Sequence, residues 1–268
     1  MSASFRVAAV QMVSEPSVAA NLDAARVLIA EAAEKGAKLV GLPEYFCIFG
    51  MRERDKVAVR ESDGSGPIQQ FLSGMAREHG VWIVGGSVPL VSSDPGKVMN
   101  SCLVFDDRGE RVARYDKIHL FGFATENERY DESATIEAGG APAAIDTPFG
   151  RLALSICYDV RFPELYRRLS PMDIIFVPSA FTATTGRAHW EILLRARAIE
   201  NLAYVVAPAQ GGRHANGRQT HGHSMIVDAW GTVLGCLPGG PGVVVAEIDP
   251  AFQARKRASL PALEHRVL

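Results

Sequence analysis

The sequence has almost no net charge and no long apolar run. Its 28 lysine and arginine residues are nearly balanced by 30 aspartate and glutamate residues, for a net charge of −2. Nucleic acid and anionic membranes are therefore poor candidate partners. No apolar run approaches the ~20 residues that a membrane-spanning helix needs, and the N-terminus lacks the parts of a signal peptide. We expect a soluble, cytoplasmic protein that binds neither membrane nor nucleic acid.

Cysteines are few and widely spaced. They form no C-x-x-C pair, which argues against a zinc knuckle, and their scatter argues against a disulfide framework. Three late histidines have no carboxylate or cysteine beside them at a recognisable ligand spacing. We therefore expect no metal and no cofactor, and a reducing compartment that leaves the thiols free. The residues concerned are Cys47, Cys102, Cys157, Cys236, His214, His221 and His223.

Apolar periodicity predicts strands and helices that alternate along the whole chain. Helical spacing starts after Ser17 and ends at Gly36, and a second helical pattern covers 67–79. Residues 121–140 show little periodicity, so we expect a long irregular segment, a type that is often functional. The alternation predicts a layered α/β fold, and the lack of a linker predicts one domain over 1–268. The expected strands are 5–12, 38–42, 81–88, 99–105, 110–115, 151–156, 173–177, 202–208, 224–227, 231–236 and 243–248, and later helices begin near Pro163, His189 and Pro250.

Cys157 stands where a short apolar run ends and a helix begins. The run 151–156 follows a glycine and is typical of a buried strand, and Pro163 with Glu164 suits the first turn of a helix. Exposed N–H groups at such a corner favour negative charge, so we expect the pKa of the thiol to lie below its free value of about 8.5. The alternative is that Cys157 is only a small buried hydrophobic residue.

Two further polar residues follow predicted strands. Glu44 comes directly after the strand 38–42, and Lys117 follows the strand 110–115. If these strands and the one before Cys157 are neighbours in one sheet, the three side chains converge on one edge. A thiolate, a carboxylate that carries a proton and an ammonium that stabilises an oxyanion together support acyl transfer. Taken singly, Glu44 also fits a surface acid, and Lys117 a solvated cation.

Three blocks that contain these residues resemble the signatures of the nitrilase superfamily, the carbon–nitrogen hydrolases. They are Gly-Leu-Pro-Glu ending at Glu44, Tyr-Asp-Lys-Ile-His-Leu around Lys117, and Ser-Ile-Cys-Tyr-Asp-Val-Arg-Phe-Pro-Glu around Cys157. The resemblance implies a four-layer αββα sandwich that stacks to αββααββα in a homodimer, with these three residues as the catalytic triad. It also implies a fourth acid at Glu132 that positions the lysine, with competitors at Glu126, Glu128 and Glu137.

Later tracts are similar to the Nit-type amidase branch of this superfamily. The tract 209–214 resembles the deaminated glutathione amidases more than the omega-amidases, although Gly211 stands where many members have cysteine. The resemblance implies a small amide that carries a carboxylate as the substrate, cleaved through a cysteine thioester. Deaminated glutathione is the leading candidate, and α-ketoglutaramate, α-ketosuccinamate or a nitrile are alternatives. A non-catalytic scaffold is a rival that the intact triad disfavours.

Arginines and aromatic residues near these blocks are candidates for substrate recognition. Arginines in the glycine-rich late loops could hold a carboxylate through paired hydrogen bonds, although solvated arginines look the same in a sequence. Aromatic residues could line the pocket or belong to the core, and one backbone N–H beside the cysteine could receive an oxyanion. The candidates are Arg187, Arg213, Arg218, Tyr45, Phe121, Phe181 and, for the N–H group, Tyr158.

Overall fold

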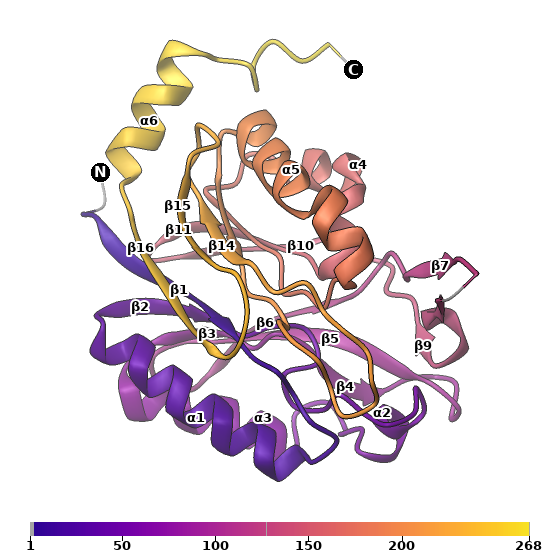
Figure 1. Ribbon diagram of the computed structural model, residues 1–268. Coiled ribbons are helices and arrows are strands. Elements are labelled where there is room, and N and C mark those ends of the chain that lie inside the picture. The colour runs from indigo at the N-terminus through magenta and orange to yellow at the C-terminus, as the bar shows by residue number, and fades with distance from the viewer. Residues whose placement is uncertain (1–2, 127, 268) are drawn as a thin grey trace.

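Two β-sheets lie face to face in the centre of the molecule, and helices cover the outer face of each sheet (Figure 1). The computed structural model describes residues 3–126 and 128–267. Its layers run helix, sheet, sheet, helix, which confirms the αββα sandwich.

The first sheet is formed mainly by the N-terminal half of the chain. Its strands are β1 (Phe5–Gln11), β2 (Ala37–Gly41), β3 (Trp82–Val84), β4 (Val88–Val91), β5 (Val98–Phe105), β6 (Arg111–Asp116), β9 (Ile136–Glu137) and β16 (Gly242–Ile248). The order is β16-β1-β2-β3-β5-β4, and β6 and β9 also pair with β5. Because β16 returns from the far end of the chain to pair with β1, the two halves of the sequence share this sheet.

The second sheet comes from the C-terminal half. Its strands are β10 (Ala143–Thr147), β11 (Gly150–Leu154), β12 (Ile174–Phe176), β13 (Tyr204–Ala207), β14 (Ser224–Val227) and β15 (Val233–Leu237), which pair in sequence order. The strands β11, β12 and β13 are parallel, and the others are antiparallel to their neighbours. A separate hairpin, β7 (Gly122–Ala124) and β8 (Arg129–Asp131), lies to one side (Figure 1).

The helices form the two outer layers. The first sheet is covered by α1 (Val18–Glu34) and α3 (Pro67–His79), and the second by α4 (Pro163–Leu169) and α5 (Ala183–Asn201) (Figure 1). Shorter helices are α2 (Asp55–Ala58), α6 (Pro250–Ser259) and two 3-10 turns at Glu132–Ala134 and Cys157–Arg161. Among the described residues, no helix combines the length and the apolar character that crossing a membrane requires.

Side chains on the two faces of the first sheet pack into two separate hydrophobic cores. In β1, Val7 and Ala9 pack into the cluster between the two sheets, whereas Ala8 and Val10 pack against α1 and α3. Successive side chains of a strand point to opposite faces, so a strand covered on both sides reads as a continuous apolar run. The fully buried strands of both sheets therefore hold their ends, where the polar candidates lie, in fixed places.

Most predicted elements are present, and three expectations were wrong in detail. The predicted strand 81–88 is broken at Gly85 and Gly86 into β3 and β4, and α5 begins at Ala183, six residues before the predicted start at His189. The segment 121–140, expected to be irregular, contains the β7–β8 hairpin, a 3-10 turn and β9. In contrast, the helix predicted for 67–79 has the bounds Pro67–His79 that its proline start and glycine stop suggested.

Candidate active site

Glu44 lies just past the end of β2 and is 1% exposed. Its Oε1 accepts hydrogen bonds from Asn100 Nδ2 at 3.0 Å and from Lys117 Nζ at 2.7 Å. The backbone around it is also fixed, because Gln210 Nε2 donates to the Glu44 carbonyl at 3.1 Å. A carboxylate this deeply buried needs such partners to be stable, so its position is set by several elements at once.

Lys117 follows β6 and joins two carboxylates. Its Nζ lies 2.7 Å from Glu44 and 2.8 and 2.9 Å from the two oxygens of Glu132. Phe121 N–H and the Tyr45 hydroxyl complete the contacts of Glu132, at 2.7 and 2.8 Å. Among the competing acids, Glu128 accepts from Thr184 and Glu137 from Ser93. Glu132 is therefore the acid that the fold places on the lysine.

Cys157 is the first residue of a 3-10 turn that follows β11. Its φ of 51° lies in the left-handed region that non-glycine residues seldom adopt, a strain that a surrounding structure must hold in place. The Cys157 N–H donates to the Pro178 carbonyl at 2.9 Å, and the thiol lies within hydrogen-bonding reach of Glu44. The condition of one shared sheet is not met, although the side chains still converge. Cys157 comes from the second sheet, whereas Glu44 and Lys117 come from the first, so the residues meet between the sheets.

The protonation of these groups follows from burial and from one shared cation. Burial raises the pKa of Glu44, and the charge of Glu132 adds to this effect, although Lys117 opposes it. Burial also acts to raise the pKa of Glu132, but its double contact with Lys117 outweighs burial and lowers that pKa. Burial acts to lower the pKa of Lys117, yet the two carboxylates raise it well above its usual value, so the lysine stays charged.

The expected low pKa of the Cys157 thiol was wrong. Burial and the nearby charge of Glu44 raise the pKa of Cys157 well above its usual value, and Lys117 only partly offsets them. Cys157 begins a single short 3-10 turn. The N–H groups of this turn lower the pKa of the thiol by less than burial of the sulfur raises it. The resting site therefore holds a neutral thiol next to a carboxylate that can accept its proton.

Asp159 connects the element that carries Cys157 with the one that carries Lys117. Its Oδ2 accepts from the Ile156 N–H at 2.8 Å and from the Tyr115 hydroxyl at 2.7 Å. Its Oδ1 accepts from the His119 N–H at 3.1 Å and lies 2.7 Å from His119 Nδ1. The side chain is fully buried. This carboxylate fixes the end of β6 against the turn of the nucleophile candidate.

A cavity of about 200 Å³ opens directly on Cys157. Three residues predicted to contact substrate, Phe121, Tyr158 and Phe181, line it, together with Ala180, Thr182 and Thr185. As the second residue of a 3-10 turn, Tyr158 has an N–H group with no acceptor inside that turn. The cavity thus combines an apolar wall with a backbone donor beside the sulfur.

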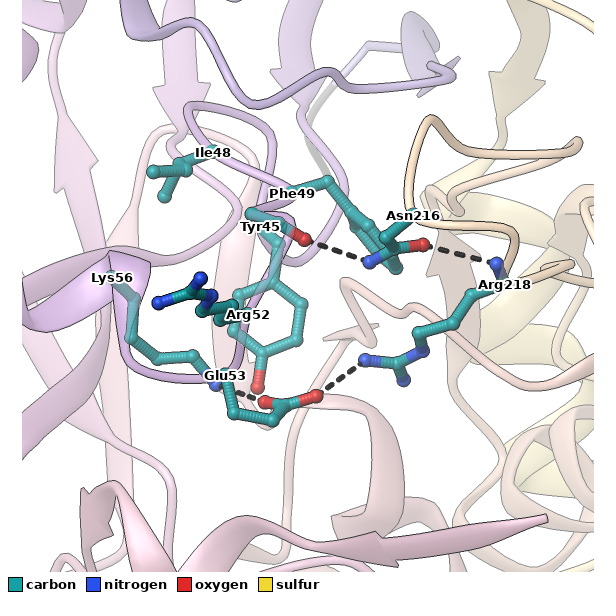
Figure 2. A pocket seen from close by; sticks show the side chains of 9 residues that line it. Tyr45, Ile48, Phe49, Arg52, Glu53, Lys56, Asn216 and Arg218 are labelled. Carbon is teal, nitrogen blue, oxygen red and sulfur yellow. Dashed lines mark hydrogen bonds and ion pairs between the residues drawn. The ribbon is translucent and has the colours of Figure 1, made fainter.

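A second cavity of about 280 Å³ has Tyr45 in its wall (Figure 2). Arg218 reaches into it from the loop after β13. Arg187 and Arg213, also predicted to bind substrate, lie elsewhere: Arg187 lines a surface pocket with His221 and His223, and Arg213 is exposed. Of the three arginines considered from the sequence, the fold brings only Arg218 to a cavity next to the buried charges.

Comparison with known proteins assigns the chain to a family. The profile of the carbon–nitrogen hydrolases matches residues 6–257. The chain belongs to the carbon–nitrogen hydrolase family. One relative is the deaminated glutathione amidase of Synechocystis, 45% identical over 269 residues that cover 98% of each chain. Nit3 of Saccharomyces cerevisiae, described as a member of branch 10 of the nitrilase superfamily, superposes with a TM-score of 0.88 at 30% identity and covers 100% of this chain and 98% of its own.

A third similar protein bears on the nucleophile. A glutamate-to-glutamine mutant of the amidase from Nesterenkonia sp. AN1 superposes on this carbon–nitrogen hydrolase with a TM-score of 0.77 at 29% identity, covering 96% of this chain and 98% of its own. That mutant is described as showing Michael addition of acrylamide at its active site cysteine. The likeness is to a protein whose cysteine forms a covalent bond with an amide-bearing molecule.

Several residues of the hydrolase's site were not singled out from the sequence. Asn100 lies within the buried strand β5, where no local signal marks its contact with Glu44. Asp159, Tyr115 and His119 stand inside or beside the signature blocks, but only the fold shows that they bond to one another. Among the described residues, no group of three or more His, Cys, Asp or Glu side chains has a metal-binding arrangement.

Proposed function

We propose that this hydrolase is an amidase that cleaves the C–N bond of a small carboxylate-bearing amide, with deaminated glutathione as its leading substrate. The observation that carries the proposal is the meeting of Glu44, Lys117 and Cys157, all at most 7% exposed, behind a cavity that Cys157 lines. The substrate is supported by the amidase of Synechocystis, which is named for it and is 45% identical.

In the first half of the reaction, the Cys157 sulfur attacks the amide carbon while Glu44 takes the thiol proton. The raised pKa of Glu44 makes its carboxylate a stronger base for the thiol proton than an ordinary glutamate. The oxyanion that forms is stabilised by the Lys117 ammonium and the Tyr158 N–H. Glu44 then protonates the nitrogen, the C–N bond breaks, and the amine leaves behind a thioester.

In the second half, water replaces the amine in the same place. Glu44 removes a proton from the water, whose oxygen attacks the thioester carbon, and the same two donors stabilise the second oxyanion. The carbon–sulfur bond breaks, and the proton held by Glu44 returns to the sulfur. The sum is amide plus water giving acid plus amine. Glu132 acts as a positioning residue, since it contacts Lys117 rather than the reacting atoms.

Location and assembly are part of the proposal. A mechanism that needs a free Cys157 thiol is served by the reducing cytoplasm, where we place the protein. We also propose a homodimer that stacks two sandwiches through the α4–α5 layer. Support comes from the exposed apolar side chains Ile192 and Ile199, seven residues apart on α5 and 70% and 48% exposed. Trp230 is 45% exposed and precedes Gly231, which packs on Ile199.

Replacement of the nucleophile tests the proposal. Cys157→Ala is expected to lower turnover of deaminated glutathione to background, because no other thiol reaches Glu44, while the melting temperature changes little. The measurement is release of the amine product, run beside α-ketoglutaramate and a simple nitrile to rank the substrates. Cys102→Ala is the matched control, because Cys102 is equally buried and burial likewise raises its pKa, to about 12, but it lies inside β5. Substantial turnover by the Cys157 variant would overturn the mechanism.

A further inference from the structure

The cavity beside Tyr45 is lined by more cations than acids, and the proposed reaction does not account for this excess. It is lined by the cations Arg52, Lys56 and Arg218 and by one acid, Glu53 (Figure 2). The mechanism above uses none of these four groups. A concave site with an excess of cations is suited to an anion.

Arg218 is held rigidly in this cavity. Its guanidinium lies over two aromatic rings, 5.1 Å from the ring centre of Phe49 and 4.6 Å from that of Tyr130. Its backbone N–H donates to Asn216 Oδ1 at 3.0 Å, and Asn216 Nδ2 donates to the Gly50 carbonyl at 2.7 Å (Figure 2). Because the plane of the guanidinium is fixed in advance, little freedom is lost when it binds an acid.

Glu53 bridges Lys56 and Arg218, the two cations of this cavity that are most buried. Its Oε1 lies 2.8 Å from Arg218 Nη1 and its Oε2 lies 2.9 Å from Lys56 Nζ (Figure 2). Burial acts to raise the pKa of Glu53, but Lys56 and Arg218 outweigh burial and lower it, so the group is ionised at neutral pH. The Glu53 side chain is nevertheless 48% exposed, against 10% for Lys56 and 25% for Arg218. The acid is thus the member of the set that is most free to leave.

The cavity shares a wall with the buried charges. The Tyr45 hydroxyl donates to Glu132 Oε1 at 2.8 Å, while Lys56 Nζ lies 4.9 Å from the centre of the Tyr45 ring. Glu132 in turn contacts Lys117. One aromatic ring therefore separates Lys56 from the acid that positions the lysine.

We propose that Lys56 and Arg218 bind a carboxylate of the substrate, remote from the amide that is cleaved, and that Glu53 occupies this place until substrate displaces it. The inference rests on the proposed function and names the part of the site that selects carboxylate-bearing amides. Glu53 shows that one carboxylate fits both cations together. Because Glu53 competes for the cations, its loss frees the site for a ligand.

Binding to the inactive Cys157→Ala protein tests this site without turnover. Isothermal calorimetry with deaminated glutathione is expected to give a Kd that Arg218→Gln and Lys56→Gln each raise about tenfold or more, the typical effect of losing a charged hydrogen bond. Glu53→Gln is expected to lower the Kd. Arg54→Gln is the matched control, since Arg54 is exposed on the same loop and does not line the cavity, and it leaves the Kd unchanged.

Two ligands identify which carboxylate binds. Deaminated glutathione with its terminal carboxylate converted to an amide loses the effect of Arg218→Gln if the glycine end occupies the site, and keeps it if the keto-acid end does. Either result supports the site. Equal Kd values for all variants, or weaker binding after Glu53→Gln, overturn it. If Arg218→Gln lowers the melting temperature, Arg218→Lys gives the same comparison. Turnover by the wild-type enzyme is measured separately, so failure of the amidase proposal is seen independently of these binding values.

Discussion

Three buried charges at the centre of the site do not cancel, and this imbalance determines how Glu44 is protonated. Lys117 makes two contacts with Glu132, at 2.8 and 2.9 Å, and one with Glu44, at 2.7 Å. Burial acts to raise the pKa of both acids. The contacts with Lys117 outweigh burial at Glu132, whose pKa is lowered, but not at Glu44, whose pKa is raised. A single cation between two acids thus produces one fixed anion and one acid that exchanges its proton, as general acid–base chemistry requires.

Glu132→Gln is expected to move the acid limb of the pH profile. Glu44 works as a base only when ionised, so kcat/KM falls as pH drops through its raised pKa. The charge of Glu132 is one cause of that raised pKa, and its removal also leaves Lys117 to Glu44 alone. Both changes lower the pKa of Glu44, so the acid limb shifts to lower pH. We expect kcat to fall about tenfold or more as Lys117 loses charged contacts.

The measurement is kcat/KM for deaminated glutathione across the acid range. Glu137→Gln serves as the control, because Glu137 is an acid of the same segment that bonds Ser93 and lies away from Lys117. It leaves the acid limb in place. An acid limb that moves to higher pH in the Glu132 variant would contradict the account of the shared cation.

Single residues were predictable where they end a regular element. Glu44, Lys117 and Cys157 were proposed because each follows a predicted strand and stands in a recognisable block. Asn100 was not, since a polar residue inside a buried strand gives no indication of which side chain it faces. The expected low thiol pKa failed for a related reason: the effect of burial depends on neighbours that are far away in sequence.

Elements were predictable where local chemistry alone decides them. The helix α3 has a proline in its first turn and Gly80 in the left-handed conformation at its end, and its bounds were predicted correctly. The apolar run 81–88 was predicted as one strand, but Gly86 breaks it with a φ of 58°. A Cβ atom on Gly86 would lie 2.2 Å from the Pro43 carbonyl oxygen, so the break lets the loop of Glu44 pass close by. This close approach is a tertiary contact, so the periodicity of the sequence does not indicate it.

The link between β6 and the turn of Cys157 gives a prediction at this scale. Asp159→Asn replaces an acceptor of several hydrogen bonds by an amide whose NH₂ group faces the Ile156 N–H or the Tyr115 hydroxyl. We expect the free energy of unfolding to fall by about 1–3 kcal/mol. We also expect kcat to fall while KM changes little, because the relative position of Lys117 and Cys157 shifts but the substrate cavity stays. Urea unfolding and steady-state kinetics measure the two effects.

Tyr115→Phe is the control for this link. It removes one hydrogen bond to Asp159 and leaves the others, so a smaller loss of about 1 kcal/mol is expected. If Asp159→Asn lowered stability yet left kcat unchanged, the residue would hold the fold without positioning the site.

At the scale of the molecule, the site exists only because two sheets from different parts of the chain face each other. Glu44, Lys117 and Glu132 belong to the first half, and Cys157 to the second. Periodicity identified the strands but not their sheets, and for that reason it left open whether the strands before these residues share one sheet. The sandwich itself was implied by resemblance of the three blocks to a family, and not by any pattern within a single element.

The outer helices carry the last prediction, which concerns assembly. Ile192 is 70% exposed and Ile199 48% exposed on α5, while Val27 is 66% exposed on α1 in the opposite layer. If two sandwiches stack through α5, Ile192→Asp places a charge in the interface and disrupts the dimer. The mass obtained from sedimentation velocity is then expected to fall from twice the 28.9 kDa of the chain to that of one chain. Val27→Asp, an identical change on the other layer, stays dimeric. Dissociation by Val27→Asp alone would instead place the interface on α1, because a buried charge disrupts only the surface that is covered.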